Sequence, residues 1–281
     1  MYGKIIGAMI GFTLLRIPGA IIGAIVGHMF DVGYAKDFSQ KGGFARFFSS
    51  SSNIQSQAVF FHALFSALGH ISKADGKVTP EEIAIASNLM DSMRLQGDMR
   101  KEAQQAFRDG KAKDFPLDAM LKDFKLYSHN RRDVMQIFLE ILISAACADG
   151  RITPSELKIL ETVAASLGFS RNDLHFLISS HEAEQRFRQG GSHSRQQGQS
   201  RQQQYQQYSD QHSLADAYKI LGASQSDDDK TIKRAYKKQM SQHHPDKLSA
   251  KGLPEQALEM AKTKTQDIQA AYEIIKKKRG F

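Results

Sequence analysis

The most specific chemical pattern in this 281-residue chain is His244-Pro245-Asp246. A carboxylate such as Asp246 can accept two hydrogen bonds from one arginine, and an imidazole can donate or accept one. Pro245 restricts the backbone, so less entropy is lost when the tripeptide binds a partner. A metal site at His243, His244 and Asp246 is an alternative, but the proline and the tight spacing direct these ligands poorly. We therefore interpret the tripeptide as a recognition site.

Two helices must position this tripeptide. Apolar residues recur at helical spacing over 228–242, and again from about Pro254 to Lys277. Pro245 ends the first helix, because the residue before a proline avoids the α region. We expect a polar loop to join the two helices into an antiparallel hairpin with the tripeptide at its exposed tip.

The first of these helices carries a basic band, formed by Lys233, Lys237 and Lys238, and Lys247 extends it beyond the tip. Residues 213–281 carry fourteen Lys and Arg against nine Asp and Glu, a net charge of +5. Such a band speeds encounter with an acidic surface. A solvated helix face is the alternative interpretation. Nucleic-acid binding is not expected, because interleaved aromatic residues and a groove-reading motif are missing.

This region resembles the J-domain of the DnaJ co-chaperone family. Four blocks match in order over about 65 residues: 216–222, 232–238, 244–246 and 268–273. The resemblance implies docking on the ATPase domain of a DnaK-type chaperone and stimulation of its ATP hydrolysis. Because the Gly/Phe-rich segment, the zinc-binding cysteines and the substrate-binding domain of full DnaJ are missing, we do not expect this end to hold unfolded chains. The chaperone-binding residues that it implies, together with the basic band, are His244, Pro245, Asp246, Lys233, Tyr236, Lys237, Lys238 and Lys247.

Two residues depart from the family pattern. Gln239 stands where an apolar residue usually faces the last helix, and Thr265 replaces a common aromatic residue. We expect a thinner hydrophobic core at this point.

A nine-residue pattern occurs twice in the preceding region, at 74–82 and 148–156. In each copy a glycine suited to the left-handed conformation is followed by Thr-Pro-x-Glu, which predicts an N-cap, a proline at the first helical position and a capping box. The pattern therefore predicts a helix–turn–helix corner used twice in a pseudo-two-fold bundle. It resembles the TerB-like family of tellurite resistance, which implies an all-α fold with a regulatory or partner-binding role.

Metal binding at these corners is a weaker alternative. The candidate oxygen ligands are Asp75, Glu82, Asp149 and Glu156. An EF-hand loop, however, needs acidic residues at several alternate positions, and Lys77 or Arg151 occupies one of them. We favour the capping role.

The N-terminal segment 5–27 has one charged residue, Arg16, and as a helix it would span about 34 Å, enough to cross a bilayer. Glycines lie in one four-residue phase, which lets two membrane helices approach closely and predicts a homodimer. Arg16 at mid-span costs about 2.5–3.5 kcal/mol and has no acidic partner in the segment. The predicted dimer contacts are Gly7, Gly11, Gly19, Gly23 and Gly27, in register with Gly3.

A cleaved signal peptide is the rival interpretation of this segment. We prefer an uncleaved anchor, because the basic region before it is Lys4 alone and no clear cleavage site follows. Lys36, Lys41 and Arg46 follow the segment, and this bias places the C-terminal side in the cytoplasm. We expect a single-pass protein of the inner membrane.

The predicted fold class is all-α. This order of domains resembles the membrane-anchored DnaJ-like co-chaperones. The predicted organisation is a transmembrane anchor over 1–30, a tether over 31–54, a TerB-like helical domain over 55–182, a disordered Gln/Ser-rich linker over 183–212 that lets the next domain rotate freely, and a J-domain over 213–281.

No enzymatic chemistry is expected. The one cysteine, Cys147, lies in an apolar run and indicates neither a disulfide framework nor a zinc site. No nucleophile elbow or glycine-rich phosphate loop occurs, so no cofactor is expected. The prediction is therefore a co-chaperone that acts with a DnaK-type partner at a membrane. The alternative is an envelope-stress signalling scaffold that acts mainly through the TerB-like domain.

Overall fold

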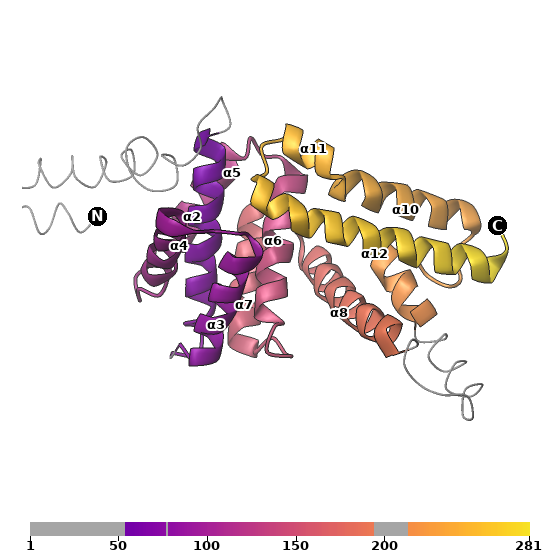
Figure 1. Ribbon diagram of the computed structural model, residues 1–281, viewed down its shortest axis with the longest axis horizontal. Helices are drawn as coiled ribbons and strands as arrows, with labels where there is room; N and C mark the ends of the chain where they lie inside the picture. Colours follow the sequence, from indigo (N-terminus) through magenta and orange to yellow (C-terminus); the bar gives the residue numbers. More distant parts are fainter. Residues whose placement is uncertain (1–53, 77, 194–212) are drawn as a thin grey trace, which may run out of the picture. The chain divides into compact units, whose positions relative to one another are not determined.

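The computed structural model describes residues 54–76, 78–193 and 213–281, and this part of the chain is helical without a strand (Figure 1). The predicted all-α class is therefore confirmed. Residues 60–281 form one compact unit. The first helices are α2 (Ile54–Ile71), α3 (Pro80–Ser92), α4 (Gly97–Gly110), α5 (Leu117–Tyr127), α6 (Arg132–Ala146), α7 (Pro154–Leu167) and α8 (Arg171–His193).

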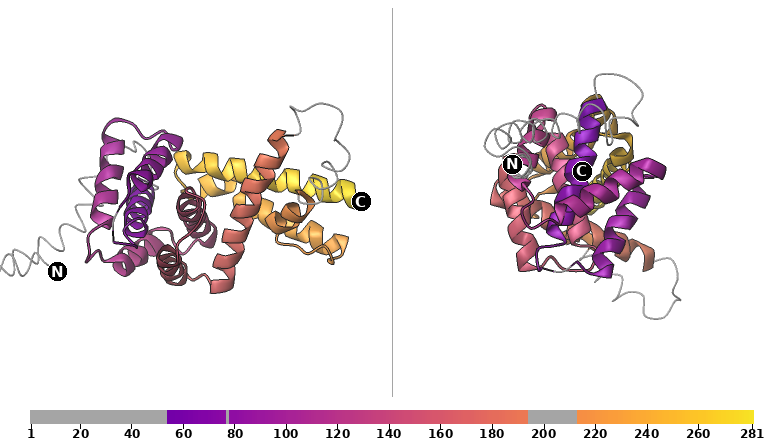
Figure 2. Two further views of the ribbon diagram at one scale, coloured as in Figure 1. Left: turned by 90° about the horizontal axis from the view of Figure 1, so that it is seen from below. Right: turned by 90° about the vertical axis from the view of Figure 1, so that its left-hand side faces the viewer.

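The C-terminal helices form the predicted hairpin. A short helix covers 213–221, and α10 (Asp229–His243) and α12 (Glu255–Arg279) run side by side (Figures 1 and 2). Both long helices lie within two residues of their predicted bounds. Their shared core contains buried Ile232, Ile268 and Ile275, together with Tyr218 and Leu221 of the short helix.

The core of the preceding bundle is rich in phenylalanine. Phe60 of α2 makes edge contacts with Phe124 of α5 and Phe138 of α6, each at a ring-centroid distance of 5.9 Å. Phe124 and Phe138 stack at 4.3 Å. Such pairs add about 0.5–1.5 kcal/mol each beyond their buried area, and they bring the first half of the repeat against the second.

The two repeated corners fold as predicted. Gly76 and Gly150 have φ of 96° and 111°, the left-handed region that favours glycine. Thr79 and Thr153 each cap the following helix, and in both corners the glutamate of the capping box accepts a hydrogen bond from the N-cap backbone. The predicted capping role of the repeat is confirmed.

Helices α2 and α4 pack with their backbones unusually close together. A methyl group on Gly110 would lie 1.9 Å from the carbonyl oxygen of Ser66, and one on Gly69 would lie 2.1 Å from that of Phe107. Nδ1 of His70 lies 3.2 Å from the Gly110 carbonyl oxygen. Only glycine fits at these two helical positions.

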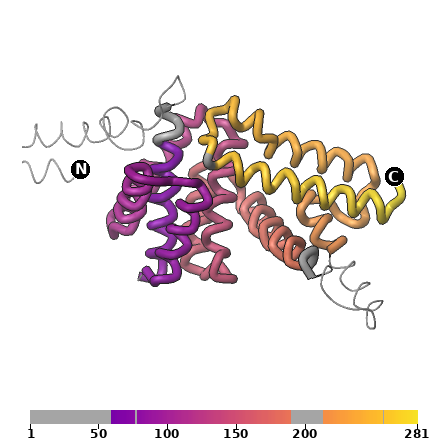
Figure 3. The backbone as a smooth tube through the Cα atoms, in the orientation of Figure 1, coloured from indigo at the N-terminus to yellow at the C-terminus, as the bar shows by residue number. Residues whose placement is uncertain are grey.

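Helix α8 contradicts part of the predicted linker. It continues to His193, so residues 183–193 are helical and not coil. The coloured part of α8 can be followed in Figure 3. Buried Ala183 and partly buried Phe187 belong to the hydrophobic cluster of the C-terminal hairpin. The predicted free rotation of that hairpin is therefore wrong for this structure, because α8 packs against α6 and α7 and also against the hairpin.

Several predictions concern residues that the structure does not describe. The predicted anchor with its glycine stripe, residues 31–53 of the tether and residues 194–212 of the linker lie outside the described residues. Among the helices at 54–193 and 213–281, none combines the length and apolar character needed to cross a bilayer.

Candidate functional site

The His-Pro-Asp tip lies between two helices rather than in a loop. Helix α10 ends at His243, His244 is extended at φ −64° and ψ 120°, and Pro245 begins the short helix α11 (Pro245–Ala250). The Asp246 amide donates to Nδ1 of His244 at 3.2 Å. The predicted polar loop is therefore wrong. The proline ends one helix and starts the next, since its missing N–H is not needed at the first helical position.

Neighbouring side chains hold this corner in place. The Thr265 hydroxyl lies 3.0 Å from the His243 carbonyl oxygen and 2.8 Å from that of Ala261, so it ties α12 to the end of α10. Lys247 donates to the Ser241 hydroxyl at 2.7 Å. At Thr265, where we expected a thinner hydrophobic core, side-chain hydrogen bonds therefore help to position the tip.

The basic band is accessible to a partner. Lys233, Lys237 and Lys238 are exposed, as are Asp246 and Lys247, while His244, Pro245 and Tyr236 are half-buried. The Tyr236 ring stacks on Tyr272 at 4.0 Å, and Nζ of Lys233 lies 4.6 Å from the centroid of the Phe281 ring. The structure therefore brings the eight predicted residues onto the outer side of α10 and its tip, with Tyr236 also packing against α12.

Three of the four weak metal candidates accept hydrogen bonds within the two corners. The Thr79 amide donates to Glu82 at 2.7 Å, and the Thr153 amide donates to Glu156 at 2.8 Å. Burial and the nearby carboxylates of Asp75 and Glu156 raise the pKa of Glu82, although its hydrogen bonds to Thr79 oppose the shift. Asp149 accepts from the Arg151 amide at 3.4 Å. Within the described residues, no three metal-binding side chains gather at one point.

Three family descriptions match successive parts of the chain. Residues 1–37 match the co-chaperone DjlA transmembrane domain, residues 61–177 match the tellurite resistance protein TerB, and residues 216–280 match the DnaJ domain. The corner and the basic band described above lie inside the last of these.

Relatives match over the whole length. The co-chaperone protein DjlA of Vibrio parahaemolyticus is 48% identical over 286 residues, covering 100% of this chain and 99% of its own length. The corresponding proteins of Photobacterium profundum and Yersinia pestis are 44% and 43% identical, again over 100% of this chain. The chain belongs to the DjlA co-chaperone family. No solved structure matches it.

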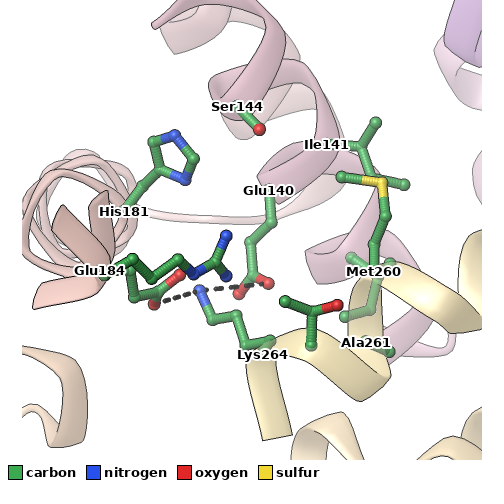
Figure 4. Close-up of a pocket in the computed structure, with 11 residues that line it drawn as sticks. Glu140, Ile141, Ser144, His181, Glu184, Met260, Ala261 and Lys264 are labelled. Carbon is green, nitrogen blue, oxygen red and sulfur yellow. Dashed lines mark ion pairs between the residues drawn. The ribbon is translucent and has the colours of Figure 1, made fainter. Parts of the chain in front are cut away.

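In this DjlA-family chain, a network of buried charges joins the TerB-like and J-domain regions (Figure 4). Lys264 of α12 lies 3.5 Å from Glu140 of α6 and 2.9 Å from Glu184 of α8. His243 faces acceptors on both ring nitrogens: Nε2 lies 3.0 Å from Glu140, and Nδ1 lies 2.9 Å from the Gln239 carbonyl oxygen.

Burial and charge oppose each other in this network. Burial by itself would raise the pKa of Glu140, but Lys264 and His243 hold that pKa below its ordinary value, helped by hydrogen bonds from His243 and Gln136. Burial would likewise lower the pKa of Lys264, but the carboxylates of Glu140 and Glu184 raise it. The network is therefore stable in its ionised form, because each charge has a close partner.

We use "seam" for the contacts of α6 and α8, with the turn before α6, against residues 213–281. Besides the buried network, Lys251 pairs with Asp133, and Arg131 donates to the Lys251 carbonyl oxygen. Farther along, Arg188 pairs with Asp267 through Nε at 3.0 Å. Arg186 pairs with buried Asp216 at 2.9 Å.

A cavity of about 180 Å³ opens beside the network, between α6, α8 and α12 (Figure 4). His181 lines it, and burial, with the positive charges of Lys264 and Arg188, lowers the pKa of His181 to about 4. Its ring is therefore neutral at neutral pH.

Sequence reasoning missed the residues of the seam. One signal was present: Glu140 is the lone charged residue in the largely apolar stretch 137–146, where a buried charge needs a partner. The identity of that partner could not be read from the chain, because His243 and Lys264 lie more than a hundred residues away.

Proposed function

We propose that this chain stimulates ATP hydrolysis by a DnaK-type chaperone at a membrane and has no catalytic activity of its own. The observation that carries the proposal is the exposed Asp246 carboxylate beside an exposed band of three lysines. A carboxylate in this position suits an arginine of the partner, and the band suits an acidic surface around it.

The proposed chaperone-binding residues are the tip, Lys247 and the outer side of α10. His244 caps α11 through Nδ1, so it sets the direction in which Asp246 points. Lys233, Lys237 and Lys238 supply the long-range attraction, and half-buried Tyr236 lies among them. Pro245 keeps the corner rigid, which lowers the entropy lost on docking.

His244→Gln tests the proposal. Steady-state ATP turnover of the chaperone should fall to its basal rate with this variant, while the circular dichroism spectrum stays that of the wild type. Undiminished stimulation by the variant would refute the role of the tip.

A second pair of variants tests the basic band. Lys237→Ala should weaken stimulation at low salt and lose that difference as salt screens the charge. Lys262→Ala is the matched control, because Lys262 is also an exposed lysine but lies on α12. Equal effects of the two variants would contradict the docking role of the band.

The match to a DjlA transmembrane domain supports membrane anchoring. We further propose that the anchor is a single pass through the inner membrane, with the later domains in the cytoplasm, where ATP is present. The glycine phase supports a homodimer through Gly7, Gly11, Gly19, Gly23 and Gly27. Crosslinking of intact protein in membranes, compared with a variant carrying Ile at two of these glycines, distinguishes a dimer from a monomer.

The alternative function, a signalling scaffold that acts mainly through the TerB-like domain, is better tested with a point variant than with a deletion of the J-domain. Removing residues 213–281 would uncover Ala183 and Glu184 of α8, which are buried in the intact protein. His244→Gln leaves that surface covered. A cellular phenotype that survives this variant would favour the scaffold.

A further inference from the structure

The seam is built mainly from charged groups. Side-chain exposure is 1% for His243, 12% for Lys264, 11% for Glu140 and 5% for Glu184, so four ionisable groups meet with little exposure to solvent. Around them lie the more exposed pairs of Lys251 with Asp133 and Arg188 with Asp267.

Such a seam specifies orientation more than it adds stability. Each buried ion loses several kcal/mol of hydration, and its partner returns that energy only when the geometry is good. A rotated or shifted J-domain would leave Glu140 or Glu184 buried without a cation, which is strongly unfavourable. The charges therefore disfavour alternative docking arrangements.

Helix α8 adds an apolar contribution to the same orientation. Ala183 and Phe187 extend from the end of a bundle helix into the hydrophobic cluster of the J-domain. Close contact also occurs at Gly222, where a methyl group would lie 2.9 Å from the Phe176 ring. The J-domain is thus held by a rigid helix and not by its chain connection alone.

The face proposed to bind the chaperone lies outside this seam. The seam uses His243, Lys251, Lys264 and Asp267, which belong to the inner side of the hairpin. The three lysines of the band, Asp246 and Lys247 remain exposed while the seam is closed. Docking therefore leaves the candidate site accessible.

We propose that the TerB-like domain is a mount for the J-domain: the α6–α8 surface binds the inner face of the hairpin, and the DnaK-type chaperone binds this docked form. The inference rests on the proposed function for its second half. It implies that the chaperone is recruited in a fixed orientation relative to the TerB-like domain, and hence to whatever that domain binds.

The test is a distance measurement between spin labels on the full-length protein. Asn88→Cys on α3 and Gln269→Cys on α12 place labels at exposed sites outside the seam. Cys147 is buried, and burial with the nearby carboxylates raises the pKa of its thiol to about 12, so it reacts slowly at neutral pH. Labelled chains are diluted with unlabelled chains in lipid nanodiscs, so that the measured distances lie within one chain.

With the seam residues unchanged, the distance between the two labels should have one narrow distribution. A broad distribution would overturn the proposal that the TerB-like domain holds the J-domain in one orientation. Glu140→Lys, which places a second lysine beside Lys264 in the seam, should broaden the distribution. The control Asp123→Lys, a charge reversal at an exposed position of α5, should not.

A charge swap guards against misfolding of the Glu140→Lys protein. Asp267→Lys faces Arg188 with a like charge and should broaden the distribution, whereas Asp267→Lys combined with Arg188→Glu should restore it. Failure of the swap to restore the narrow peak would overturn the assignment of this pair to the seam.

The second half of the proposal, that the chaperone binds the docked form, is tested by adding saturating DnaK-type chaperone with ATP to the labelled protein. An unchanged peak supports binding to the docked form, and a shifted or broadened peak overturns it. ATP turnover in the same sample reports whether the chaperone is engaged at all. Absence of stimulation would mean that the proposed function fails, whereas the distances of the free protein would still decide whether the mount exists.

Discussion

Lys264→Met should destabilise the compact unit strongly at neutral pH. Lys264 is 12% exposed and bridges Glu140 and Glu184, and methionine keeps its length without its charge. Removing one partner of a buried ion pair costs about 3–5 kcal/mol, because the other partner stays buried and charged. We expect about 3 kcal/mol, the lower end of this range, because His243 still pairs with Glu140.

The loss should depend on pH, with a sign that follows from the pKa shifts. The pKa of Glu140 is held below its ordinary value of 4.5, so its ion pairs contribute stability above that pH and lose it in acid. The pKa of Lys264 is raised above 10.5, so its contribution is complete below pH 10.5 and is lost only as pH rises through the higher folded value. Both contributions are present at pH 7.

In the variant, Glu140 keeps its burial and loses Lys264, so its pKa rises relative to that of the wild type. Its carboxyl then takes up a proton more readily in mild acid, which removes a buried charge that has lost one of its two partners. The difference in unfolding free energy between wild type and variant should therefore shrink from pH 7 to pH 5.

Urea unfolding followed by circular dichroism at both pH values measures this difference. Lys262→Met is the matched control, an exposed lysine two residues earlier on α12, and should change stability by less than about 0.5 kcal/mol. The reasoning is refuted by a loss that is the same at pH 7 and pH 5, or by equal losses in the two variants. Hydrogen exchange in α8 and α12 shows whether the seam opens first.

Two further predictions concern the bundle. Gly110→Ala should lower the unfolding free energy by about 1–3 kcal/mol in urea titrations. The new methyl group would lie 1.9 Å from a backbone oxygen of α2, and this overpacking outweighs a gain in helix propensity of about 1 kcal/mol. A more stable variant would show that α2 and α4 separate easily. Thr79→Val and Thr153→Val should each lower the unfolding free energy by about 1 kcal/mol through loss of the N-cap hydrogen bond. The two effects should add in the double variant if the corners are independent. No measurable loss at either site would contradict the capping role.

The sequence predicted the local features of this protein well, for identifiable reasons. Caps, left-handed glycines and the proline at the tip depend on residues within one or two turns of each other. For this reason Thr79 with Glu82, and Thr153 with Glu156, could be assigned before any coordinates were known. The exposed tip follows from the same local rules, since Pro245 cannot continue α10.

Two local predictions failed where tertiary contacts outweighed composition. Residues 183–193 are rich in Gln and Arg and were predicted to be coil, but Ala183 and Phe187, one turn apart, gain burial against the J-domain core. The polar stretch after Asp246 forms helix α11 because Leu248 is buried at its centre. In both cases an apolar side chain is buried by packing that the local pattern does not show.

By itself, the sequence determined the two long helices of the hairpin, where the repeated corners turn and which residues form the tip, since hydrogen bonds between near neighbours decide these. The tertiary structure alone decided that Glu140 meets His243 and Lys264, and that the J-domain rests on α6 and α8. The physical reason is that a charge can be buried only where folding brings an opposite charge to it, and that pairing depends on the whole path of the chain.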